Sequence, residues 1–181
     1  MANRSYLYSV HQGEEPEVRD LAEWNYNIPL IHLLLVGFDG EVVPTRIWDN
    51  GAMTAILGSG PPARAFVSRV LDWLEPQLPD AGSEIAEARS ALTRADRQGT
   101  GYLLEAGEVY ALSAGSLEQM QEAARRDLKA SRVVVEELRG LMDEPSATIA
   151  SAQHFALTDA FSDWKQDLGL YFADVLYFHL G

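Results

Sequence analysis

Residues 116–142 have the sequence SLEQMQEAARRDLKASRVVVEELRGLM, the longest stretch of the chain with helical periodicity. Ser116, followed three residues later by Gln119, has the form of a capping box, in which both side chains satisfy free backbone N–H groups. Glu122 and Arg126 lie one helical turn apart and add a little support. The stretch therefore predicts a long amphipathic helix. Its apolar face consists of Leu117, Met120, Ala124, Leu128, Val135, Leu138 and Met142.

Three further helices are predicted before this one. A segment rich in glycine and proline precedes a helix that we expect to end near Glu75, because the prolines that follow cannot continue it. Ser83 is placed to cap another helix, which glycines in residues 99–101 end. Pro29 suits the first turn of a short helix over residues 30–36, although a buried strand is an alternative there.

Strands are expected in the remaining apolar stretches. Residues 5–10 alternate in the manner of a strand, and residues 42–48 predict an edge strand because Pro44 cannot donate to a neighbour. Residues 102–104 and 109–112 flank a glycine-containing turn and predict a hairpin. The expected architecture is α+β, dominated by helices, with a small antiparallel sheet.

Length and composition favour one domain over residues 1–181. The chain has 181 residues, 47% of them hydrophobic, which falls short of the roughly 250 to 300 residues at which chains split into several cores. It contains no cysteine, begins without a secretory signal, and has no apolar run long enough to span a bilayer. We therefore expect a cytoplasmic protein that is not bound to a membrane.

The charge balance points away from nucleic acids. The chain has 27 acidic and 14 basic residues, a net charge of -13, and no terminal tail carries the excess. Phosphate backbones require clustered Lys and Arg, so we expect no nucleic-acid partner. An acidic surface keeps a protein soluble, and it also attracts a basic protein partner.

No motif for catalysis, a cofactor or a metal stands out. Residues 96–107 begin like a calcium loop, but Gly107 occupies the twelfth position, where a bidentate Glu is needed. None of the four histidines has a partner at metal-pair spacing, and the common nucleotide-binding and nucleophile motifs are absent. We expect no catalytic, cofactor or metal residues. One alternative stays open, a site assembled from His32 with Asp39 or Asp49.

The most informative feature for function is a run of aspartates near the end of the chain. On a continuous helix, Asp159, Asp163, Asp167 and Asp174 fall within about 80° of arc. The simplest interpretation is the solvated face of an amphipathic helix. The functional interpretation is a docking surface, because Leu170 and Tyr177 would project into the aspartates and suit an interface with a charged rim. The predicted partner-binding residues are Asp159, Asp163, Asp167, Leu170, Asp174 and Tyr177.

Gly169 provides an alternative for the same region. If it breaks the helix, residues 170–180 form a strand and the row shortens to three aspartates.

The start of the chain resembles a known kind of protein. The opening MANRSYLYS, the sequence LAEWNY at residues 21–26 and then Pro29 resemble a family of small uncharacterised bacterial proteins. The resemblance covers roughly the first 35 residues and implies no activity and no site residues. Small acidic cytoplasmic proteins of this kind look like the immunity partners of bacterial toxins.

The sequence leaves three hypotheses for the function. The leading hypothesis is a protein that binds another protein, most concretely an immunity or antitoxin-type partner that covers a basic toxin surface. The second is an enzyme whose site is assembled from scattered residues. The third is a structural subunit that self-associates, as a homodimer for example, through Tyr171, Phe172, Tyr177 and Phe178.

Overall fold

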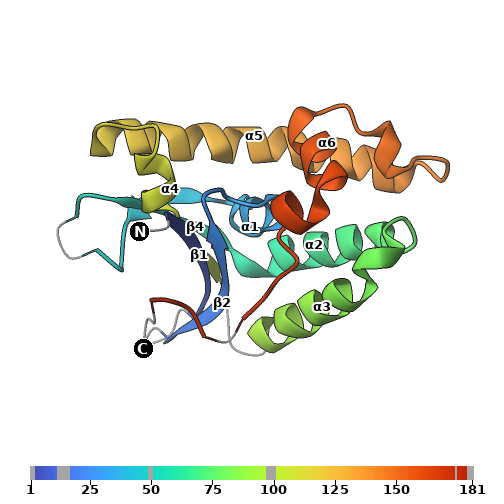
Figure 1. Cartoon of the computed structure of the whole chain (residues 1–181), viewed down its shortest axis with the longest axis horizontal. Coiled ribbons are helices and arrows are strands. Elements are labelled where there is room, and N and C mark those ends of the chain that lie inside the picture. The colour runs from blue at the N-terminus through green and yellow to red at the C-terminus, as the bar shows by residue number, and fades with distance from the viewer. Residues whose placement is uncertain (1–2, 12–16, 49–50, 97–100, 174, 179–181) are drawn as a thin grey trace.

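A computed structural model describes residues 3–11, 17–48, 51–96, 101–173 and 175–178 (Figure 1). One five-stranded sheet, with every neighbouring pair antiparallel, has the strand order β2-β1-β5-β4-β3. The first two strands pair with each other, and β5 lies between β1 and β4, so that β2 and β3 are the edges. The strands are β1 (Arg4–His11), β2 (Glu17–Asn25), β3 (Glu41–Pro44), β4 (Thr54–Ser59) and β5 (Gly101–Glu105).

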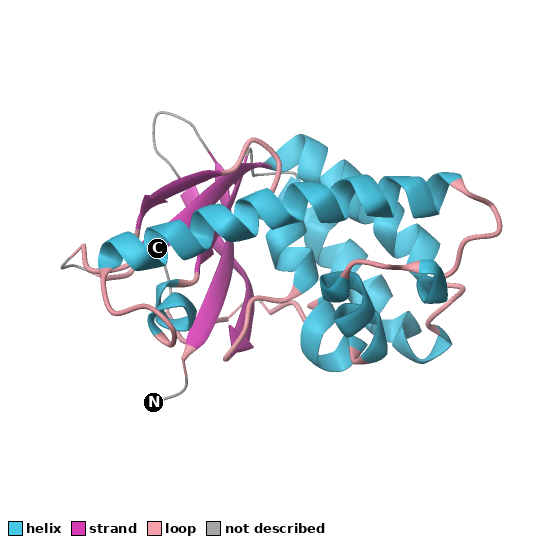
Figure 2. Cartoon of the chain, turned by 90° about the horizontal axis from the view of Figure 1, so that it is seen from above, coloured by secondary structure: helices cyan, strands magenta, loops and turns pink. Residues whose placement is uncertain are grey.

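The helices gather on one face and at one end of this sheet (Figure 2). The longest, α5, has 27 residues and packs against α1, α2, α4, β3 and β4. The α-helices are α1 (Leu30–Val36), α2 (Gly60–Leu74), α3 (Gly82–Asp96), α4 (Gly107–Ala111), α5 (Leu117–Asp143) and α6 (Phe155–Ser162). Three single turns complete the set, the 3-10 helices η1 (Pro79–Ala81) and η2 (Ile149–Ser151) and the π-helix η3 (Trp164–Leu168). No helix within the described ranges is long and apolar enough to cross a membrane.

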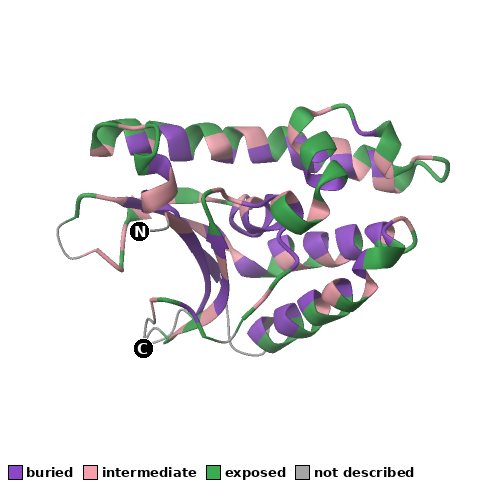
Figure 3. Cartoon of the chain, in the orientation of Figure 1, coloured by how far each residue is buried: buried purple, intermediate pink, exposed green. Residues whose placement is uncertain are grey.

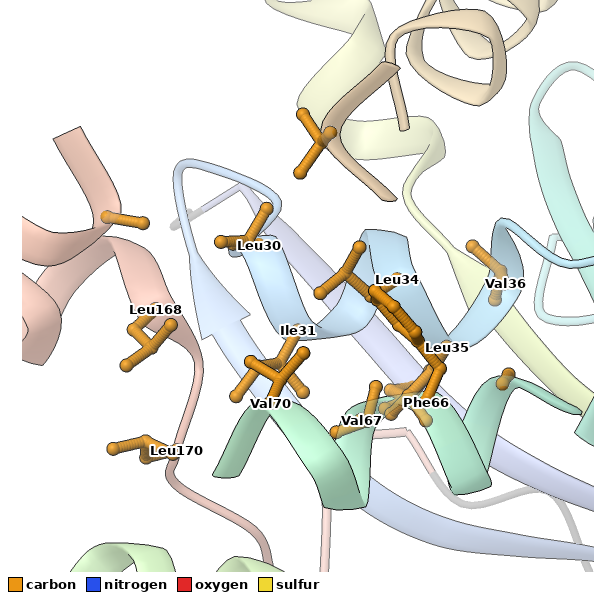
Figure 4. Packing of buried hydrophobic residues seen from close by; sticks show 14 of the residues in the cluster. Leu30, Ile31, Leu34, Leu35, Val36, Phe66, Val67, Val70, Leu168 and Leu170 are labelled. Carbon is orange, nitrogen blue, oxygen red and sulfur yellow. The ribbon is translucent and has the colours of Figure 1, made fainter. Parts of the chain in front are cut away.

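The main core lies between the sheet and the helices. Helix α1 stands at its centre, because its sequence LIHLLLV is apolar on nearly every side and six of its seven residues are buried. Ile31, Leu34 and Leu35 have no exposed surface, and they face Val67 and Val70 of α2 in the same cluster (Figure 4). An all-round apolar helix is stable only when it is enclosed in this way.

The second face of the sheet has a smaller apolar cluster of its own. Tyr6, Tyr8 and Leu103 are buried there together with Leu176 from the carboxyl-terminal segment. The Tyr8 hydroxyl donates to the Phe178 carbonyl oxygen at 3.0 Å, which ties this segment to β1. Burial raises the pKa of Tyr6 to about 12. The segment after α6 therefore covers sheet surface that the helices leave open.

The α+β, helix-dominated class with an antiparallel sheet is confirmed, and the four helices predicted up to residue 142 form as α1, α2, α3 and α5. Ser83 does not cap its helix, because α3 already begins at Gly82. The capping prediction is confirmed in part, since the Ser116 hydroxyl accepts from Gln119 N at 3.3 Å while the Gln119 side chain accepts from Gly115 N. The predicted hairpin is wrong. Residues 102–104 do form a strand, but its partners are β1 and β4, and residues 109–111 belong to α4. Strands β2 and β4 were not predicted.

Candidate functional site

Asp159, Asp163 and Asp167 do not lie on one continuous α-helix. Helix α6 ends at Ser162, η3 follows as a single π-turn, and Gly169 then adopts a left-handed conformation with φ 84°. A Cβ at this glycine would lie 2.8 Å from the Pro29 side chain, so the turn also packs closely against the start of α1. Gly169 breaks the helix, as the alternative interpretation expected, but the described part of residues 170–180 contains no strand.

Two predicted contact residues serve the fold instead. Leu170 is fully buried in the main core, because the chain turns inward after Gly169 beside α1 and α2 (Figure 4). Asp167 is half-buried and accepts a hydrogen bond from Asn27 Nδ2 at 2.7 Å. The Trp24 indole N–H donates to the neighbouring carbonyl of Gln166 at 2.7 Å. The expectation that Leu170 projects among exposed carboxylates is wrong.

Tyr177 lies elsewhere on the molecule. Its side chain is 65% exposed, but the Arg4 guanidinium stands 4.6 Å from the ring centroid, and its backbone N–H donates to Glu23 Oε2 at 2.7 Å. These contacts place it beside β1 and β2 rather than on α6. Asp174 lies outside the described residues.

The other carboxyl-terminal aromatics pack largely against their own chain. Tyr171 stacks on Trp24 with ring centroids 5.6 Å apart. Phe178 makes edge contacts with Tyr6 at 5.5 Å and Trp48 at 5.1 Å. Phe172, which also belongs to the predicted self-association residues, is half-buried against the main core. Self-association through this set stays a prediction.

Three exposed side chains at four-residue spacing form what we call the acidic aromatic face, namely Phe155 and Asp159 of α6 and Asp163, the residue that follows its last turn. Phe155 is 70% exposed, and both carboxylates are exposed. The backbone N–H of Asp163 still donates to the Asp159 carbonyl at 3.0 Å, so the three residues follow one another at one-turn intervals. Neither carboxylate has an ion-pair partner among the described residues. The sequence interpretation included both aspartates but missed Phe155, although its four-residue spacing from Asp159 is visible in the sequence.

Helix α6 is held firmly, so this face has a fixed position. The Glu137 carboxylate of α5 accepts from the backbone N–H groups of Gln153 at 2.5 Å and His154 at 3.1 Å. The His154 ring then accepts from Ala156 N at 3.2 Å and caps the helix. The opposite side of α6 is buried through Leu157 and neighbouring residues, whereas its outer side is exposed (Figure 3).

The structure does not form the site suggested for His32 with Asp39. The imidazole is fully buried between the rings of Trp24 and Phe172, and neither ring nitrogen has a hydrogen-bond partner among the residues that the structure describes. Burial lowers its pKa to about 3, which keeps the ring neutral near pH 7. Asp39 lies in an exposed turn with φ 50°, and Asp49 lies outside the described residues. His32 is therefore a core residue, and the His32–Asp39 pair is wrong.

A cleft of about 340 Å³ between α4, α5 and the start of α1 contains the titratable pair that the sequence interpretation missed. The Tyr110 hydroxyl donates to Asp127 Oδ2 at 2.9 Å. Burial raises the pKa of the Asp127 carboxyl and of the Tyr110 hydroxyl. Because the phenol proton is already engaged by the carboxylate, the geometry makes this pair a link between α4 and α5.

The described residues contain no cluster of His, Asp and Glu suited to a metal ion.

Comparison with known proteins gives a family without an assigned activity. Residues 7–154 match the family described as Domain of unknown function (DUF7822), and the chain belongs to that family. No curated protein and no solved structure shows a significant match to the chain. The match includes α5 and ends at His154, one residue before the acidic aromatic face begins.

Proposed function

We propose that this member of a family without a known activity binds another protein, and that the acidic aromatic face of α6 meets a basic surface on that partner. In its most concrete form the partner is a toxin whose basic surface the chain covers, as an immunity protein or antitoxin does. The observation that carries the proposal is the exposure of Phe155 directly beside two unpaired carboxylates.

Phe155 has the properties of an interface anchor. A phenylalanine with 70% of its surface in water leaves apolar area unburied, and burying such area contributes about 25 cal/mol per Å². Binding energy concentrates in a few central aromatic residues that are surrounded by a polar rim. Asp159 and Asp163 supply such a rim on the same side of the helix, and Glu137 fixes the helix in place.

The net charge of the whole chain also favours a basic partner. A net charge of -13 draws a basic partner toward the protein and speeds encounter, while the charges nearest the contact set the orientation. Association should therefore weaken as ionic strength rises, because salt screens exposed charges beyond about 8 to 10 Å.

Charge reversal on α6 tests the proposal. The wild-type chain, the double variant Asp159→Lys with Asp163→Lys, and a control double variant Asp80→Lys with Glu87→Lys are each immobilised and exposed to extract from the source cells. The control reverses two exposed carboxylates on η1 and α3 and changes the net charge equally. Retained proteins are identified by mass spectrometry.

We expect a basic protein to be retained by the wild type and by the control but not by the α6 variant. Phe155→Ala should weaken the same interaction, since it removes the anchor and leaves the charge unchanged. Equal retention by all three chains would show that α6 is not the contact. Retention of acidic proteins only, or of none, would contradict the proposal.

The toxin version has a separate test. Cells that produce the retained partner alone should stop growing, and coexpression of this chain should restore growth. Continued growth arrest in the presence of a stably expressed chain would exclude the toxin version, while leaving protein binding to be judged by the retention experiment.

A further inference from the structure

A cationic groove runs along α5 in this otherwise acidic chain. Five of the 14 basic residues lie between positions 125 and 139, and four of them face one side. At 100° per residue, Arg125, Lys129, Arg132 and Arg139 fall within about 80° of arc. Because the rest of the chain is strongly acidic, this side of α5 is a local reversal of charge.

Two adjoining cavities lie beside these cations. The first, of about 400 Å³, is lined by Gly40, Val42, Arg125, Leu128, Lys129 and Arg132. The second, of about 250 Å³, includes Phe38, Val135 and Arg139, and it shares Arg132 with the first. The two therefore form one groove between α5 and the segment that joins α1 to β3. Its size is that of a small-molecule site.

Close backbone packing fixes the wall of the groove opposite α5. A Cβ at Gly40 would lie 2.6 Å from Leu128 Cδ2 and would also strike the Val36 carbonyl oxygen. A Cβ at Gly37 would lie 2.8 Å from the Ser131 hydroxyl. The absence of side chains at both positions lets the turn approach the helix, so the groove exists before any ligand binds.

The two ends of the groove differ in free charge. Lys129 and Arg132 are exposed, and within the described residues neither has an ion-pair partner. Arg125 has one ion-pair partner in the described part of the chain, Glu122 at 3.6 Å. At the other end Arg139 is paired with Glu136 at 2.5 Å, and Asp39 lines the cavity. Net positive charge is thus confined to the first cavity, whereas the second offers Phe38 and Val135 as apolar surface.

We propose that this groove binds a phosphate monoester of a small molecule, with the phosphate among Arg125, Lys129 and Arg132 and its ring or other apolar part against Phe38 and Val135. Three cations that line one cavity suit a dianion, and Arg and Lys are the common ligands of phosphate oxygens. The carboxylates at the second cavity repel an extended polyanion such as nucleic acid. This site is independent of the α6 face.

Isothermal titration calorimetry with chosen probes tests the assignment. The probes are inorganic phosphate, a nucleoside monophosphate, the corresponding nucleoside, and an oligoglutamate peptide. The wild type should bind the monophosphate more tightly than inorganic phosphate, and it should bind the nucleoside weakly. This order follows if the charged end supplies most of the affinity and the apolar end adds to it.

Reversal of the two free cations should remove binding of the phosphate probes. Lys129→Glu with Arg132→Glu should lower the affinity for the monophosphate by about tenfold or more for each charge, as expected for hydrogen bonds to an ionised group. The control, Arg19→Glu with Arg69→Glu, has the same net charge and alters exposed cations that are already paired on β2 and α2. It should bind within about twofold of the wild type. Thermal unfolding checks that each variant is folded.

A third variant separates the two ends. Phe38→Leu should lower the affinity for the monophosphate severalfold and leave the affinity for inorganic phosphate unchanged. The substitution removes the flat ring but keeps an apolar side chain at this position. Equal loss in the control and groove variants, or no phosphate binding by the wild type, would overturn the proposal. Tighter binding of oligoglutamate than of the monophosphate would overturn it in favour of an acidic polypeptide. An unchanged monophosphate affinity in Phe38→Leu would overturn the assignment of the apolar end.

Discussion

The cationic groove on α5 and the acidic aromatic face on α6 are opposite in charge, and they also differ in how regularly spaced residues become a surface. On α5, cations at positions 125, 129, 132 and 139 share a side because the helix continues unbroken for 27 residues. After α6, the regular spacing of the aspartates does not place them along one side of a helix, since α6 ends after eight residues. A charge pattern in the sequence predicts a surface only where the helix persists.

Burial explains why one helix persists and the other ends. Helix α5 has an uninterrupted apolar stripe, and every turn of that stripe reaches the core or the sheet. After α6 the apolar residues Leu168 and Leu170 lie on either side of Gly169, and both are fully buried. A helix cannot bury both beside α1, whereas a left-handed glycine lets the chain do so.

Truncation of Leu170 should have the largest effect on stability in the segment after α6. We expect Leu170→Ala to lower the free energy of unfolding by about 2 to 5 kcal/mol, the usual cost of a cavity at a fully buried leucine. Urea denaturation measures the change. Val175→Ala serves as the control, because this residue is 73% exposed in the same segment and should change stability by less than about 0.5 kcal/mol. A similarly small effect at Leu170 would mean that the segment is not part of the core.

The close approach of the turn to α5 at the groove depends on Gly40. We expect Gly40→Ala to lower the free energy of unfolding by about 1 to 3 kcal/mol, because its Cβ would overlap Leu128 and Val36 in a packed region. The matched control is Gly140→Ala on α5, where a Cβ meets nothing within 4 Å. This control should gain about 0.5 to 1 kcal/mol from better helix propensity. Thermal and urea unfolding distinguish the opposite signs, and equal effects would contradict the close approach.

Much of the helical part of the fold could be predicted from local signals. Periodicity, the prolines after Glu75 and the serine at position 116 bounded the helices, because these signals act within one or two turns. The sheet was harder. Strand β2 alternates weakly between exposed and buried residues, and β4 has four of its six residues buried, so neither shows the clean pattern of a half-exposed strand.

The candidate sites were predictable only in part, for a related reason. The spacing of the cations on α5 was visible, but only the turn at Gly37 and Gly40 shows that they line a groove, and that contact joins distant parts of the chain. The exposure of Phe155 depends on which side of α6 faces the core. The pair of Tyr110 and Asp127 forms across 17 positions and has no sequence motif.

A buried acid on α5 should make the stability of the chain depend on pH. Burial raises the folded-state pKa of Asp127 on α5, so the folded chain binds more protons than the unfolded chain in the range just above the ordinary carboxyl pKa. The contribution of Asp127 to stability is therefore lost as the pH rises above the ordinary carboxyl pKa of about 4. Asp127→Asn should reduce this loss, because the amide does not ionise and its oxygen can still accept from Tyr110.

Tyr110→Phe provides the opposite change. The Tyr110 hydroxyl favours the ionised carboxylate, so its removal should raise the pKa of Asp127 further and increase the loss of stability as the pH rises above about 4. Urea midpoints measured across this range compare the wild type with both variants. Slopes that change in the same direction in Asp127→Asn and Tyr110→Phe would contradict the assigned role of this pair.

The smallest effect is expected on the acidic aromatic face itself. Asp159→Lys with Asp163→Lys should change the free energy of unfolding by no more than about 0.5 kcal/mol, since both carboxylates are exposed and neither has an ion-pair partner in the described part of the chain. Any change should be a slight gain at low salt that fades as salt is added, because two reversals bring the net charge closer to zero. Urea midpoints at low and moderate ionic strength measure it. A loss above about 1 kcal/mol would show that these aspartates support the fold, and the face could then no longer be treated as a surface free to meet a partner.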